Sequence, residues 1–372
     1  MNKSVFDLFT QGPLWIIESW IFVIFMALVF TCSPAIWVNK DITLPPAYEL
    51  KADHPFADTS TLTIPAHEGE RSHGAKLTPR LVGSILLNIA TRASCHPYLP
   101  ATLFGCLFLL SGIVIGFQIT HDRLVALFIG LIFSGLYATS ACFSINLMPK
   151  PFDGVVIGLL GLTLISIQRP WLLATTSFLS CWSDERAVLS LLFIAVVVLS
   201  WPSVNIQKKL RQCSIIALSI VSYVATRLVI TFALGWQVPD ISYIGDNIQL
   251  SLLFAQVAAW LCFKGGWIPI VYVLFVLHKQ QAYMRLALIS CAILLAIVSC
   301  LIVLDASRAS AFAFPLIPAC FALLTDSGTD KRDMRIIAGV SAVVTLLSPN
   351  YEIIIGVAVK WLRPFPFFIF LK

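Results

Sequence analysis

Residues 149–190 read PKPFDGVVIGLLGLTLISIQRPWLLATTSFLSCWSDERAVLS. Two apolar segments lie on either side of Arg169-Pro170, and each is shorter than the about 20 helical residues that cross a bilayer. If both segments are helices, their outer ends lie at the same face of a membrane. Ionisable residues stand at those ends: Asp153, Asp184, Glu185 and Arg186. The segment therefore predicts a short helical hairpin, and its charged rim is what an enzyme working on a lipid-linked charged substrate needs.

The composition of the whole chain also indicates a membrane protein. Its 372 residues are 58% hydrophobic and 12% charged, and the mean hydropathy is +0.89, outside the range of soluble domains. Apolar runs of about 15 to 25 residues match helices that cross about 30 Å of hydrocarbon, and they lack the alternation of barrel strands. We therefore predict an all-α polytopic membrane protein, with residues 1–372 forming a single integral membrane domain.

About 11–12 transmembrane or re-entrant helices are expected from the number and length of the apolar runs. Lys264-Gly265-Gly266 interrupts one long run, which predicts a broken or re-entrant passage at that point. The expected segments are 14–38, 99–119, 124–147, 154–167, 171–182, 187–201, 213–236, 248–277, 286–304, 309–324, 336–348 and 353–371.

Basic residues set the expected orientation. The most basic loop, QKKLR at residues 207–211, is expected in the cytoplasm. Counting spans back from it places the N-terminus in the cytoplasm and the rim of the hairpin on the extracytoplasmic face. The 39–97 loop, the only large hydrophilic segment, falls on that same face. The net charge of +6 is modest, and no basic run carries interleaved aromatic residues, so we expect membrane lipids and no nucleic acid as partners.

The 39–97 loop has two features that bear on function. Residues 76–93 (KLTPRLVGSILLNIATRA) place their leucines and isoleucines on one side, which predicts an amphipathic helix in the membrane interface. The acids on the expected extracytoplasmic face are Asp53, Asp58, Glu68, Glu70, Asp153, Asp184 and Glu185. A carboxylate among them could act as the general base of a glycosyl transfer, or several could hold a divalent metal ion, whereas a solvated surface position is the simpler interpretation of any single loop acid. Asp153 and Asp184 also have the positions of helix caps, and the two interpretations are compatible.

Arginines on the same expected face suit a phosphate group. Arg80, Arg186 and Arg308 each offer a planar fork of N–H donors that matches phosphate oxygens. A salt bridge between Arg308 and Asp305 is the structural alternative. Arg227 lies within an expected span, where a charge is costly, and a structural ion pair is the simplest interpretation of it.

The sequence argues against several common kinds of site. The ten cysteines are scattered without a CxxC pair, which is typical of small buried side chains and not of a metal site or a disulfide framework. His54, His67 and His73 match no metal-ligand spacing. The chain also lacks the HExxH, GxSxG, GxxxxGK[ST] and GxGxxG motifs of common hydrolases and nucleotide-binding enzymes.

The hairpin PFDGVVIGLLGLTLISIQRPWLLATTSFLSCWSDERAVL, together with a first span and a large loop bearing an interfacial helix, resembles the membrane glycosyltransferases of the GT-C superfamily. The later stretch DASRASAFAFPLIP is similar to the Arg-containing segment before a late span in bacterial relatives. The resemblance implies a GT-C-like fold, a polyprenyl-phosphate-linked sugar donor, and transfer at the extracytoplasmic face. It also implies assembly of cell-envelope glycans in a bacterial inner (cytoplasmic) membrane.

The same resemblance assigns expected roles to residues. A catalytic carboxylate is expected in the first large loop, where Asp53 and Asp58 are the candidates, although the loop lacks the acidic signature that better-defined members carry soon after the first span. Residues expected to hold the donor phosphate, or to orient those that do, are Arg80, Asp153, Asp184, Glu185, Arg186 and Arg308.

Two other functions stay open at this point. A lipid or oligosaccharide transporter, or flippase, should show an internal repeat, paired broken helices and charges within the membrane, and the sequence has one interrupted run, one mid-span arginine and no convincing repeat. A non-catalytic membrane subunit with the same fold would account for the missing acidic signature.

Overall fold

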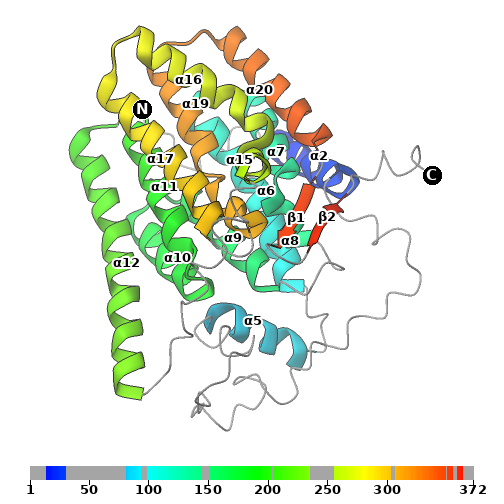
Figure 1. Ribbon diagram of the computed structural model, residues 1–372, viewed down its shortest axis with the longest axis vertical. Helices are drawn as coiled ribbons and strands as arrows, with labels where there is room; N and C mark the ends of the chain where they lie inside the picture. Colours follow the sequence, from blue (N-terminus) through cyan, green and yellow to red (C-terminus); the bar gives the residue numbers. More distant parts are fainter. Residues whose placement is uncertain are drawn as a thin grey trace.

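A computed structural model describes residues 14–30, 81–93, 99–143, 151–202, 204–234, 255–302, 306–348, 350–354 and 358–362. These residues form helices and one short pair of strands (Figure 1). The α-helices are α2 (Leu14–Phe30), α5 (Leu81–Arg92), α6 (Leu99–Thr120), α7 (Arg123–Gly135), α8 (Tyr137–Phe143), α9 (Pro151–Ile165), α10 (Pro170–Ser183), α11 (Ala187–Ser200), α12 (Ile206–Leu234), α15 (Ala255–Phe263), α16 (Trp267–Lys279), α17 (Tyr283–Ile302), α18 (Ala306–Ser310), α19 (Leu316–Asp326) and α20 (Lys331–Leu347). Two 3₁₀ turns, η1 (Lys264–Gly266) and η2 (Ala311–Ala313), join α15 to α16 and α18 to α19.

The helices confirm an all-α polytopic membrane protein. Within the described residues, five helical segments are long and apolar enough to cross a bilayer: Leu99–Thr120, Ile206–Ile230, Gln256–Lys279, Tyr283–Leu301 and Arg308–Asp326. The bent pair α7 and α8 makes a sixth if it is counted as one span. Shorter apolar helices cover Leu14–Phe30, Asp153–Ile165 and Ala187–Ser200. The total of about 11–12 membrane-embedded helices stays a prediction.

Helix α9, the first of the two short helices on either side of Arg169-Pro170, packs closely against α6. Gly154, Gly158 and Gly161 lie on one face of α9, against α6. A Cβ atom added at Gly158 would come within 2.4 Å of the carbonyl oxygen of Phe104, so the two backbones touch there. Small residues at this spacing let apolar helices approach closely in membranes, and the contact fixes the position of the α9 N-terminus.

The expected span over 124–147 is broken within its described part. Helix α7 ends at Gly135, α8 begins at Tyr137, and their axes differ by 65°. Leu136 has an extended backbone, and the carbonyl oxygen of Phe133 accepts from the N–H of Leu136 at 3.2 Å and from the hydroxyl of Thr139 at 2.7 Å. The predicted interruption of the later run is present as η1, and the helices on both sides of it together make one candidate span of 24 residues.

The expected helical segment over 353–371 is also wrong in its described part. Strand β1 (Asn350–Ile354) pairs antiparallel with β2 (Ala358–Leu362), with Glu352 opposite Lys360. β-branched and aromatic residues are frequent in both strands, as in Tyr351, Ile353, Val359 and Trp361, and they favour extended backbone. The structure does not describe 363–372.

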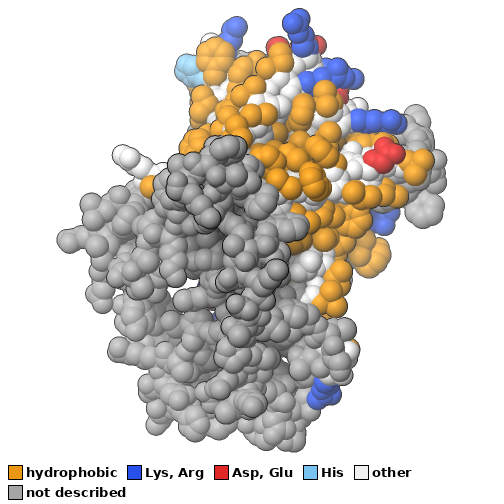
Figure 2. Space-filling view, turned by 90° about the vertical axis from the view of Figure 1, so that its right-hand side faces the viewer, with side chains coloured by type: hydrophobic (Ala, Val, Ile, Leu, Met, Phe, Trp, Pro, Cys, Tyr) orange, Lys and Arg blue, Asp and Glu red, His pale blue; other side chains and the backbone are white. Residues whose placement is uncertain are grey.

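One end of the bundle is rich in basic residues, which Figure 2 shows above a broad apolar surface. Ion pairs and hydrogen bonds connect the segments at this end, including Arg335 with Asp122 at 2.7 Å and Arg285 with Asp326 at 2.5 Å. The 207–211 segment, expected as a loop, forms the first turns of α12, and Lys208 donates from Nζ to the Gln168 side chain at 2.5 Å. Helix α5 lies across the opposite end, where it contacts α9 and α10 (Figure 1).

Candidate functional site

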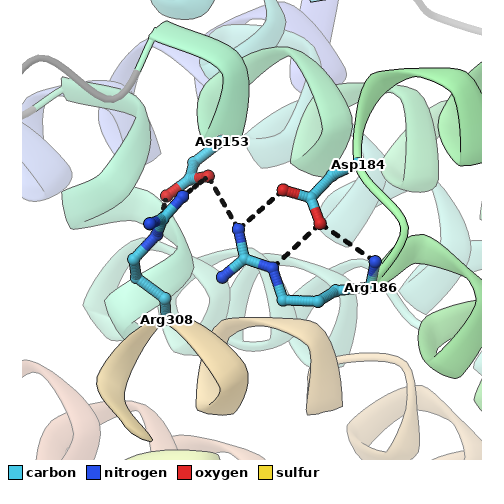
Figure 3. Close-up of polar contacts among 4 residues, drawn as sticks. All are labelled: Asp153, Asp184, Arg186 and Arg308. Atoms are coloured by element: carbon cyan, nitrogen blue, oxygen red, sulfur yellow. Dashed lines mark hydrogen bonds and ion pairs between the residues drawn. The ribbon is translucent and has the colours of Figure 1, made fainter. Parts of the chain in front are cut away.

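Four of the predicted site residues form one cluster (Figure 3) at the N-terminal end of α9 and the C-terminal end of α10. Asp153 belongs to the first turn of α9, and Asp184 and Arg186 belong to the turn between α10 and α11. Arg308 comes from α18, which is 155 residues further along the chain than Asp153. We call these four residues the rim cluster.

Asp153 is the centre of the rim cluster because it accepts from both arginines. Arg308 donates from Nε to Oδ2 and from Nη2 to Oδ1, both at 2.7 Å, which is a bidentate pair. Arg186 donates from Nη2 to the same Oδ1 atom at 3.1 Å. One carboxylate therefore ties the turn after α10 to α18.

Asp184 fixes the geometry of Arg186. Its carboxylate accepts from Nε of Arg186 at 2.8 Å, from Nη2 at 2.6 Å and from the backbone N–H of Arg186 at 2.9 Å. The Arg186 guanidinium consequently lies between the two aspartates, as Figure 3 shows. It is further held over the ring of Phe312, with 4.9 Å between Cζ and the ring centroid. Ser190 donates from its hydroxyl to the Phe312 carbonyl oxygen, which anchors that ring to α11.

Burial separates the cluster into an inner and an outer layer. The side chains of Asp153 and Asp184 are 2% and 0% exposed, whereas those of Arg186 and Arg308 are 19% and 17% exposed. Two carboxylates balance two guanidinium groups, so the four charges sum to zero. Charge-assisted hydrogen bonds of this kind compensate for the cost of burying ions, and the partly exposed groups are the cations.

The charge of Arg186 is secure at every accessible pH. Burial lowers the pKa of Arg186, but the carboxylates of Asp184 and Asp153 outweigh that effect and raise its pKa well above the ordinary value. The guanidinium therefore stays protonated and keeps its affinity for anions.

The structure brings together some of the predicted site residues and not others. Asp153, Asp184, Arg186 and Arg308 come together, while the side chain of Glu185 is exposed at the same turn. The remaining predicted site residues, Asp53, Asp58 and Arg80, lie outside the described residues, as does Asp305.

A divalent metal does not fit the two buried aspartates of the rim cluster. Both carboxylate oxygens of Asp153 and both of Asp184 already accept from guanidinium groups. No group of three or more His, Cys, Asp or Glu side chains suited to a metal occurs in the part of the chain that the structure describes. The partly exposed groups of the cluster are the two guanidinium groups, which bind anions and not metal ions.

Other charged residues differ from the expectation. Arg227 donates from Nη1 to the hydroxyl of Tyr223 at 2.5 Å, so its described partner is a phenol and not the acid of an ion pair. Lys264, which the sequence indicates only as a helix interruption, is completely buried, with its Nζ atom 2.7 Å from the Gly135 carbonyl oxygen. A lysine followed by two glycines inside an apolar run was the signal available in the sequence. For Phe312 and Ser190 no such signal exists.

Comparison with known proteins found no matching protein family, no matching curated protein and no matching solved structure.

Proposed function

We propose that this protein is a glycosyltransferase that moves a sugar from a polyprenyl-phosphate donor to an envelope glycan, lipid or protein acceptor at the extracytoplasmic face of a bacterial inner membrane. The observation that carries the proposal is the rim cluster. It holds two partly exposed guanidinium groups on two buried carboxylates at one end of the bundle.

The rim cluster supports phosphate binding through rigidity and charge. The carboxylates of Asp153 and Asp184 hold Arg186 and Arg308 by their Nε and Nη2 atoms, so the forks need little reordering when an anion arrives. A phosphate that approaches from the exposed side would add negative charge to a neutral cluster, next to two permanent cations. Arginine is suited to this because its planar donors match phosphate oxygens.

The surroundings of the cluster support a lipid-linked substrate. Helix α5 contacts α9 and α10 and exposes Ile85 and Ile89, at 48% and 58%. An exposed apolar side on a helix next to charged groups suits the boundary between headgroups and acyl chains, where a polyprenyl phosphate presents its head. In the proposed reaction a loop carboxylate, Asp53 or Asp58, takes the proton of an acceptor hydroxyl. The hydroxyl oxygen bonds to the anomeric carbon as the bond to the phosphate oxygen breaks, and Arg186 and Arg308 stabilise the departing polyprenyl phosphate.

The basic end of the bundle supports the orientation that this reaction needs. Lysines and arginines gather at the end away from the rim cluster, and such residues are enriched on the cytoplasmic side of membrane proteins. The N-terminus would then be cytoplasmic and the rim cluster extracytoplasmic.

Transfer by the purified protein tests the proposal. Proteoliposomes would receive radiolabelled polyprenyl-phosphate sugars, and label joined covalently to an acceptor would be counted. We expect transfer by the wild type, at least about tenfold slower transfer by Arg308→Gln, and wild-type transfer by Arg285→Gln, which lies in an exposed ion pair at the other end. No transfer with any donor would contradict the proposal.

One observation favours a second candidate, a transporter of lipids or oligosaccharides. The bend between α7 and α8 and the η1 interruption meet at Lys264, and broken helices that meet inside the membrane are typical of transporter sites. The same proteoliposomes separate the two functions. A transporter moves the labelled lipid between leaflets without forming a new covalent product.

A further inference from the structure

Lys264 is an ionisable residue in the middle of a candidate membrane-spanning segment. It begins η1 between α15 and α16, within the candidate span Gln256–Lys279. Its side chain is 0% exposed. A buried charge at such a depth is costly, so a specific set of partners must compensate for it.

The partners of Lys264 are the C-terminal ends of two other helices. Its Nζ atom donates to the carbonyl oxygen of Gly135, the last residue of α7, at 2.7 Å. It also donates to the carbonyl oxygen of Ser348, the residue after α20, at 3.1 Å. Carbonyl groups at helix C-termini have no partner within their own helix and carry the negative end of the helix dipole. A cation between two such ends is therefore stabilised without an acidic side chain.

The backbones around Lys264 are packed to bring these groups together. A Cβ atom added at Gly265 would lie 2.1 Å from the Ser341 carbonyl oxygen and 2.5 Å from the Thr345 hydroxyl. One added at Gly135 would lie 2.7 Å from the Thr345 methyl carbon. Lys264 itself has a φ of 47°, in the left-handed region that most side chains avoid. This strained backbone conformation occurs where α7, η1 and α20 meet.

Among the described residues, the ammonium donates to neutral carbonyl oxygens. In the part of the chain that the structure describes, no Asp or Glu forms a salt bridge with Lys264. Carbonyl oxygens without acidic ligands suit a monovalent cation, because they do not compensate for the much larger desolvation cost of a divalent ion.

We propose that the carbonyl oxygens of Gly135 and Ser348 form a monovalent-cation site that the ammonium of Lys264 occupies, and that this cation holds the bend between α7 and α8. The inference is independent of glycosyl transfer. By holding this bend, the cation also affects the position of the rim cluster. Helix α8 contacts both α9 and α18, the helices that carry Asp153 and Arg308.

Chemical rescue tests the cation site. The variant Lys264→Ala leaves the two carbonyl groups and removes the ammonium. We expect its thermal unfolding midpoint, followed by tryptophan fluorescence in detergent, to lie on the order of 5 °C or more below that of the wild type. Methylammonium chloride should raise the midpoint of the variant in a saturable manner, because the small cation can enter and donate N–H groups. Tetramethylammonium chloride at equal concentration should not, since it is larger and has no N–H donor.

The wild type is the matched control, and its midpoint should respond equally to both salts. Equal responses to both salts in Lys264→Ala would overturn the proposal, as would an unchanged midpoint in the variant without added cation.

A second pair of variants covers the case in which Lys264→Ala does not fold. Lys264→Arg keeps a cation and Lys264→Met keeps a similar length without one, so we expect clearly more Lys264→Arg than Lys264→Met in the membrane fraction. Equal amounts, including none of either, would overturn the proposal.

Discussion

At the residue scale, the most consequential group is the carboxylate of Asp153. It accepts three hydrogen bonds from two arginines and is almost completely buried. The sequence indicated that Asp153, Asp184 and Arg186 share one face, because two short helices return the chain to it. It did not indicate that Arg308 would pair with Asp153 across 155 positions, since the expected neighbour was Asp305.

Replacing Asp153 should destabilise the protein strongly. Asp153→Asn leaves Arg186 and Arg308 without one of their compensating charges, and breaking a buried pair in this manner costs about 3–5 kcal/mol. Unfolding in increasing denaturant, followed by tryptophan fluorescence, measures the loss. Asp326→Asn is the control, because its partner Arg285 is 50% exposed and such a pair contributes about 1 kcal/mol or less. Similar losses in the two variants would contradict the assignment of Asp153 as the centre of the cluster.

Asp122 should account for part of the acid sensitivity of the protein. Burial raises the pKa of Asp122, but the hydrogen bond and charge of Arg335 and the backbone N–H groups of Val125 and Leu124 outweigh it and lower the pKa. A carboxylate with a lowered folded-state pKa contributes stability that is complete above its unfolded value, about 3.9, and that is lost as the pH falls through the folded-state pKa.

The measurement is the unfolding midpoint as the pH is lowered from 7 to about 3. We expect Asp122→Asn to be less stable than the wild type at pH 7 and to lose less stability on acidification. Parallel curves for the two proteins would show that Asp122 is not involved.

At the element scale, the glycine face of α9 decides where the rim cluster forms. Glycines at 154, 158 and 161 recur at helical spacing, so this packing face was visible in the sequence even though its partner α6 was not. Other elements depend on distant partners. The bend at Leu136 lies next to Gly135, whose carbonyl oxygen accepts a hydrogen bond from Lys264, 129 positions away. No local sequence pattern predicts this bend.

A methyl group at Gly158 should separate α9 from α6. In Gly158→Ala the new Cβ atom would lie 2.4 Å from a backbone oxygen, which the helices can relieve only by moving apart, and overpacking of this kind costs about 1–3 kcal/mol. Gly339→Ala is the matched control because its nearest neighbour, at 3.2 Å, is the side-chain ring of Phe128. Thermal unfolding midpoints would test this, and an unchanged midpoint in Gly158→Ala would be the contrary result.

At the scale of the whole molecule, hydrophobic content and segment length predicted a helical membrane protein, and the described helices confirm it. The C-terminal strands show the limit of that approach. A run near the C-terminus that was expected as a helix pairs as β1 and β2, in which β-branched and aromatic residues make up half of the positions. The candidate catalytic residues Asp53 and Asp58 stay predictions, because they lie in the part of the chain outside the described residues.

Sidedness is a property of the whole molecule that labelling can establish. Glu185 lies beside the rim cluster, and Ser327 lies at the basic end. With a membrane-impermeant maleimide on intact spheroplasts, we expect Glu185→Cys to gain label over the wild-type background and Ser327→Cys to gain it only after the membrane is opened. The reverse pattern would place the rim cluster in the cytoplasm and exclude the proposed reaction site.

Binding of the donor phosphate tests the central claim most directly. The affinity of the protein in lipid nanodiscs would be measured for a short polyprenyl-phosphate sugar and for the same prenyl glycoside without phosphate. We predict binding that requires the phosphate, that persists in Arg285→Gln, and that weakens at least about tenfold in Arg308→Gln because one fork is lost. Equal affinity for the two ligands, or undiminished binding in Arg308→Gln, would contradict the account.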